Sequence, residues 1–167
     1  SDIQTTYRRA VDAFGPDYVI ITDSWNFKPH LAAVVRGYPY LLRQQALECL
    51  CPLSNLRLLP SMEQCPYNQL ANPDMCQTCV TEHGHVFGPL HRQERTLSEV
   101  SGSSYYKILR RAVEEAEAVL VVNPLTEVMF SPYAKCVRVA PSGFDPARFP
   151  WPWPDEPERE QPRKLTI

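Results

Sequence analysis

Hydrophobic residues recur along the chain in two alternating patterns, one helical and one strand-like. Residues 2–14 place apolar side chains on one helical face, with Asp2 positioned to cap the helix and Gly15-Pro16 to end it. The β-branched run from Tyr18 to Thr22 follows, and such runs are typical of strands buried on both faces of a parallel sheet. The pattern therefore predicts an N-terminal helix and a first strand.

The same alternation continues to about residue 140. A short apolar helix is predicted from Pro29, with Gly37 ending it. The later predicted elements are a strand at 40–42, a helix at 105–116, a strand at 118–122, a helix at 125–130 opened by Asn123-Pro124, and a strand at 136–140. Strands that alternate with helices at this spacing indicate an α/β domain with a largely parallel sheet and right-handed crossovers.

The character of the chain changes at Pro141. In the run Phe149 to Pro154 alternate residues are proline and lack an N–H donor, which predicts an extended linker. The last residues, Leu165-Thr166-Ile167, have the pattern of a strand that is just beginning. We therefore expect one domain over 1–149, a proline-rich linker over 150–164 and the start of a further domain at 165–167, in a chain that is a piece of a longer protein.

Charge and hydropathy narrow the range of partners. The chain has 17 Lys and Arg against 19 Asp and Glu, so no field of one sign favours nucleic acid or an anionic membrane. No apolar run approaches the ~20 residues that span a bilayer, and the N-terminus lacks a secretory pattern. We expect a soluble, cytoplasmic protein that does not bind nucleic acid, although the six cysteines leave its compartment open.

A cysteine cluster follows the second predicted strand, in an insert at about 49–85. Its spacing is that of a zinc site with four thiolate ligands, Cys51, Cys65, Cys76 and Cys79, and with Cys49, His83 and His85 as spare ligands. One or two disulfides, or free thiols packed as small hydrophobes, are the alternatives. A catalytic thiol is disfavoured, because no helix N-terminus is evident there to lower its pKa. We expect a structural brace on a long loop.

Polar side chains follow each predicted strand, and in a doubly wound sheet the ligand lies beyond these carboxyl ends. Such groups can replace the water hydrogen bonds of a polyhydroxylated ligand. The candidate cleft residues are Asp23, Asn26, Arg43, Gln45, Glu48, Asn123, Thr126, Ser142 and Gly143. The alternative for each Asp, Ser or Asn is a turn former or helix cap.

Two charged residues of this region have alternatives of their own. His30 stands at the first turn of an apolar helix, where a partly buried structural role is favoured over a ligand contact. Arg43 interrupts an apolar strand end, where an unpaired charge is costly, so its expected partner is either Glu48 or a bound anion. The phosphate-loop and acyl-transfer motifs G-x-G-x-x-G, G-K-[ST] and G-x-S-x-G are absent from the chain.

Several motifs together resemble the N-terminal domain of retaining glycosyltransferases of the GT-B fold, in the large group 1, or family four, class. They are Cys51-Pro52 with the cysteines that follow it, the strand-to-turn run from Ala116 to Thr126, and the run Val137 to Phe149 with its Pro-Ser-Gly-Phe-Asp turn. The resemblance extends from about Asp17 to Phe149. It implies a Rossmann-like, three-layer domain as the partial N-terminal half of such an enzyme.

The resemblance also implies an activity. Such enzymes transfer a sugar from a nucleotide-sugar co-substrate with retention of configuration, and this half mainly holds the sugar or glycoconjugate acceptor. The donor site would lie mostly in a missing C-terminal domain, so the fragment alone is expected to be inactive, and peripheral membrane association of the full-length protein stays open. Where the family usually has His-Asp after the second strand, this chain has Gln45-Ala46. Loss of activity in this member, or a zinc-stabilised α/β module that binds protein or carbohydrate without catalysis, are the alternatives.

Overall fold

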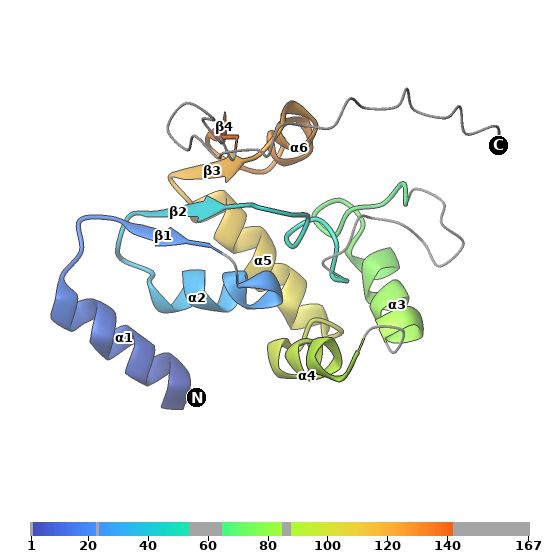
Figure 1. The fold of residues 1–167 in the computed structure, drawn as a ribbon, viewed down its shortest axis with the longest axis horizontal. Coiled ribbons are helices and arrows are strands. Elements are labelled where there is room, and N and C mark those ends of the chain that lie inside the picture. The colour runs from blue at the N-terminus through green and yellow to red at the C-terminus, as the bar shows by residue number, and fades with distance from the viewer. Residues whose placement is uncertain (1, 23, 54–64, 85–87, 142–167) are drawn as a thin grey trace, which may run out of the picture.

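Four parallel strands form the sheet at the centre of the fold. The computed structural model describes residues 2–22, 24–53, 65–84 and 88–141. Within these ranges the strands are β1 (Val19–Ile21), β2 (Tyr40–Arg43), β3 (Ala118–Val121) and β4 (Val137–Val139), and they lie in the order β1-β2-β3-β4 (Figure 1). All three pairings are parallel, which confirms the predicted α/β class and parallel sheet.

The helices confirm most of the predicted pattern. They are α1 (Asp2–Phe14), α2 (Lys28–Val34), α3 (Pro73–His83), α4 (Pro89–Ser98), α5 (Ser103–Glu115) and α6 (Pro124–Phe130), with a short 3-10 turn η1 at Trp25–Phe27. Gly15 and Gly37 follow α1 and α2 with φ of 60° and 100°, a backbone conformation that favours glycine, so the predicted stops are correct. The predicted linker 150–164 and residues 165–167 lie outside the described residues.

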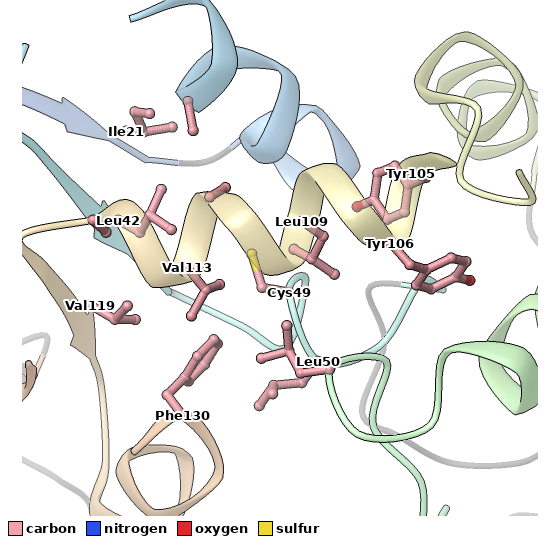
Figure 2. Close-up of a cluster of buried hydrophobic side chains, with 14 of the residues drawn as sticks. Ile21, Leu42, Cys49, Leu50, Tyr105, Tyr106, Leu109, Val113, Val119 and Phe130 are labelled. Carbon is pink, nitrogen blue, oxygen red and sulfur yellow. The ribbon is translucent and has the colours of Figure 1, made fainter. Parts of the chain in front are cut away.

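The core lies on one face of the sheet. Ile21, Leu42, Val119 and Val137 are in register across the four strands, and each is at most 7% exposed. Leu109 and Val113 of α5 and Phe130 of α6 are completely buried in the same core (Figure 2). At the ~25 cal/mol per Å² of buried apolar surface, this face supplies the main driving force for folding.

The opposite face of the sheet is only partly covered. Ile20 of β1 is 58% exposed, and its in-register neighbours Leu41 and Ala118 are half-buried. The expectation that the first strand is buried on both faces is therefore wrong for the described residues. The α/β class is correct, but helix packing on this second face, the third layer of the predicted fold, is not seen in them.

The cysteine segment is more helical than the sequence suggested. Cys76 and Cys79 lie within α3, which begins at Pro73, and α4 follows before the chain enters α5. The description of this region as a long loop, and the statement that no helix N-terminus is evident there, were wrong. Pro73 and Pro89 each occupy the first position of a helix, where a missing N–H costs nothing.

Candidate functional site at the carboxyl edge of the sheet

Asn26, in η1 after β1, lies in the protein interior and is 1% exposed. Its Nδ2 group donates to the Pro52 carbonyl at 2.9 Å and to Glu94 Oε2 at 3.3 Å, and its backbone N–H donates to Glu94 Oε1 at 3.1 Å. The Tyr105 hydroxyl donates to Asn26 Oδ1 at 3.2 Å. Because both ends of its amide are used, Asn26 joins three segments of the chain and has little capacity left for a ligand.

Glu48 is also buried, and its partner is not Arg43. Its Oε1 forms an ion pair with Lys28 Nζ at 3.0 Å, with the two side chains 3% and 0% exposed. Its Oε2 accepts from the Ala46 backbone N–H at 3.2 Å. A buried charge pair must be well satisfied to be tolerated, and this one ties α2 to the segment after β2. Glu48 is thus engaged in the fold, and the alternative in which it neutralises Arg43 is not observed.

Arg43 ends β2 on the face of the sheet opposite the core. It is in register with Leu120 of β3, which is in register with Arg138 of β4. Its Nε is buried and has no hydrogen-bond partner among the residues that the structure describes. A buried N–H of a cation is costly to leave unsatisfied, by ~1–3 kcal/mol or more, so this atom marks a place where a ligand could contribute. Gln45, two residues on, is exposed.

Asn123 and Thr126 form the N-terminal cap of α6. Asn123 Oδ1 accepts the Thr126 backbone N–H at 3.0 Å, and the Thr126 hydroxyl donates to the Asn123 carbonyl at 2.9 Å. This pairing is what the cap alternative predicted for such residues. Both side chains therefore stabilise the start of a helix.

The remaining predicted residues fall into two groups. Asp23, Ser142 and Gly143 lie outside the described residues. His30 is half-buried, and its Nε2 lies 2.8 Å from the Ser98 carbonyl, in agreement with the favoured structural role.

Sequence reasoning missed two groups of this region, both contributed by α4. The Trp25 and His91 rings stack with their centroids 4.4 Å apart. Beside them burial raises the pKa of Glu94, an effect that its hydrogen bonds from Asn26 oppose. Because α4 was not predicted, its inward-facing residues were not considered, although Pro89 followed by Leu90 and Leu97 was an available helix signal.

No protein-family model, curated protein or solved structure matches this chain. Function is therefore inferred from the fold and from the residues at the sheet edge. Within the described ranges, no helix has the length and apolarity needed to cross a membrane.

The four cysteines of the predicted cluster line one pocket of about 150 Å³. None of them forms a disulfide, and Glu82 and His83 of α3 line the same pocket. Among the described residues, no three Cys, His, Asp or Glu side chains already stand in an arrangement that holds a metal ion. Burial, together with nearby Cys51 and Cys65, raises the pKa of the Cys79 thiol, which opposes a role as a nucleophile.

A larger hollow, about 730 Å³, lies elsewhere, between α3 and α5. Lys107, Arg110 and Glu114 line it, and Arg110 is paired with Glu114 at 2.5 Å. Its lining does not include Asn26, Arg43 or Glu48. These three cleft residues and this hollow are therefore in different parts of the molecule.

Proposed function

We propose that this chain is the acceptor-side domain of a retaining glycosyltransferase of the GT-B fold, group 1 class. The α/β architecture with parallel strands is compatible with one half of such an enzyme, in which ligands lie beyond the carboxyl ends of the strands. The open face of the sheet at Ile20 is where the third layer of a Rossmann-like domain would pack. A nucleotide sugar would be the co-substrate, held mainly by the other domain.

The observation that carries this proposal is the buried Nε of Arg43, unpartnered in the part of the chain that the structure describes. It stands at the carboxyl end of β2, next in sequence to Gln44 and Gln45, where a sugar hydroxyl or a phosphate oxygen could accept its hydrogen bond. The polar groups of Asn26 and Glu48 already have protein partners, so they are not offered to a ligand in this proposal.

The role of Arg43 can be measured in the intact protein that contains this chain. Arg43→Ala is expected to lower kcat/KM for the acceptor by about 10–100-fold, because a charged hydrogen bond contributes ~1.5–3 kcal/mol. Arg9→Ala, on the exposed side of α1, is the matched control and is expected to leave the rate unchanged. The anomeric configuration of the product, read by NMR, tests retention.

The fragment and the intact protein should behave differently. Residues 1–167 alone are expected to give no transfer from any nucleotide sugar, because the proposal assigns the nucleotide-sugar site mainly to another domain. Sugar transfer by residues 1–167 alone would contradict this assignment of the nucleotide-sugar site. An intact protein that binds glycosides but never transfers a sugar would favour the non-catalytic carbohydrate-binding module, or a member that has lost activity through Gln45-Ala46.

A further inference from the structure

The cysteine pocket carries an inference independent of sugar transfer. Cysteines from three segments line it: Cys51 after the turns that follow β2, Cys65 after residues 54–64 in sequence, and Cys76 with Cys79 on α3. The chain leaves the carboxyl end of β2 on the side of the molecule where α3 lies (Figure 1). We propose that these four cysteines bind one structural zinc ion that fastens α3 to the segment after β2.

The position of two of the cysteines on α3 favours a metal ligand set. Cys76 and Cys79 are three residues apart on one helix, a spacing that places both side chains on the same face. Cys76 is buried and Cys79 is half-buried, and both line the pocket. Four thiolates in tetrahedral geometry are a common ligand set of structural zinc, with Zn–S distances of about 2.3 Å.

Tyr106 supplies a second, independent observation. Its side chain leaves α5 with the hydroxyl turned away from the Leu109 and Val113 cluster (Figure 2). The residue is 7% exposed, and its hydroxyl has no hydrogen-bond partner among the described residues. Burial, and after it the nearby cysteines Cys76, Cys79 and Cys51, raises the pKa of this hydroxyl.

A zinc-bound thiolate would satisfy this hydroxyl. A neutral thiol is a weak acceptor, whereas a metal-bound thiolate carries negative charge and accepts an O–H donor well. Donors of this kind beside metal ligands are a regular part of metal sites, and their loss typically weakens metal affinity 10–100-fold. Tyr106 lines the neighbouring hollow between α3 and α5, and its hydroxyl, unpartnered among the described residues, is a candidate donor to such a thiolate.

Metal binding requires the four sulfurs to converge from the walls of the pocket. Cys51 and Cys65 lie outside helices and strands, so their sulfurs can approach the α3 pair without breaking a helix or the sheet. The Cys65 thiol lies 3.8 Å from the Tyr67 carbonyl, a long contact. Binding would release protons from the thiols, and the zinc free energy would add to the stability of the fold.

Metal analysis of the purified chain tests the site directly. The chain is isolated under anaerobic, reducing conditions, and zinc is measured per chain by inductively coupled plasma mass spectrometry. Cobalt(II) replaces zinc in a second sample, where tetrahedral thiolate coordination gives thiolate-to-cobalt charge transfer and intense visible bands. We expect one zinc per chain and this cobalt spectrum.

Variants separate the ligands from the other cysteines. Cys79→Ser is expected to remove the bound zinc and the charge-transfer bands, whereas Cys136→Ser, just before β4 and outside the pocket, should retain both. Tyr106→Phe should keep one zinc but bind it 10–100-fold more weakly in a chelator competition. Circular dichroism of each variant shows whether it is folded.

Three outcomes would overturn the inference. The first is a reduced, folded chain with no zinc and no cobalt spectrum, all six thiols being titratable. The second is a metal-free protein whose intact mass shows two hydrogens lost per disulfide among these cysteines. The third is zinc binding that Cys79→Ser and Cys76→Ser leave unchanged.

Discussion

Two groups of polar side chains, one around Asn26, Lys28 and Glu48 and one around the cysteine pocket, differ in how fully their hydrogen bonds are used. Around Asn26, Lys28 and Glu48 every polar group of the amide and the ion pair has a protein partner. Around the cysteine pocket none of the thiols is in a disulfide, and the buried hydroxyl of Tyr106 lacks a partner among the described residues. The first group is part of the fold itself, whereas the second has bonding capacity that a ligand could use.

Breaking the Lys28–Glu48 pair should have the largest effect. Lys28→Met is expected to lower the free energy of unfolding by about 3–5 kcal/mol, because it leaves the buried Glu48 carboxylate uncompensated. Urea denaturation measures the loss. Glu117→Gln, which removes the exposed pair with Lys135, should cost at most ~1 kcal/mol.

A double variant checks the cause. Lys28→Met combined with Glu48→Leu should recover much of the lost stability, since no buried charge is then left alone. If the double variant is as unstable as the sum of the two single ones, packing rather than charge explains the effect.

Neighbouring tyrosines on α5 provide the next test. Tyr105→Phe is expected to lower the free energy of unfolding by about 1–3 kcal/mol, because it leaves the buried Asn26 Oδ1 without its donor. In metal-free protein, Tyr106→Phe should cost much less, since its hydroxyl has no described partner to lose. Equal losses of unfolding free energy for Tyr105→Phe and Tyr106→Phe, measured by thermal or urea unfolding, would contradict the contrast between the two groups.

Removing the cap of α6 should have a smaller effect. Asn123→Ala is expected to destabilise the protein by about 1 kcal/mol, the usual cost of a lost N-cap, without changing acceptor binding. Asn123→Ser, which can still cap the helix, is the matched control. A loss of acceptor binding with unchanged stability would instead show that Asn123 acts as a cleft residue.

The pH dependence of stability gives the smallest predicted signal. Burial raises the pKa of Glu94 in the folded state above its ordinary value. Its contribution to stability is therefore fully present below the pKa of the unfolded state, about 4.3, and is lost as the pH rises through the folded pKa. Glu94→Gln should flatten this fall in unfolding free energy, and Glu117→Gln should leave it unchanged.

The elements found from the sequence are those whose pattern is local. The apolar spacing of α5 and the Asn123-Pro124 start of α6 were sufficient to predict them. α3 was missed because only Cys76 and Val80 along it are buried, and its cysteines resembled ligands rather than helix residues.

The candidate site could be predicted only in part, because partners come from distant positions. Nothing near Asn26 in the sequence indicates that Glu94 and Tyr105 are its hydrogen-bond partners. Nor does the local pattern reveal that Lys28, rather than Arg43, is the partner of Glu48. The residue types after each strand predicted a polar edge, and tertiary contacts decided which groups of that edge stay available.

The strand order has a consequence for synthesis of the chain. Each strand pairs with its predecessor, so β2 can pair with β1 as soon as it leaves the ribosome. β3 arrives only after α3, α4 and α5, and until then the second edge of β2 stays unpaired. Unpaired edges are sites of aggregation, so a nascent chain that pauses within the cysteine segment would be most exposed to misassembly.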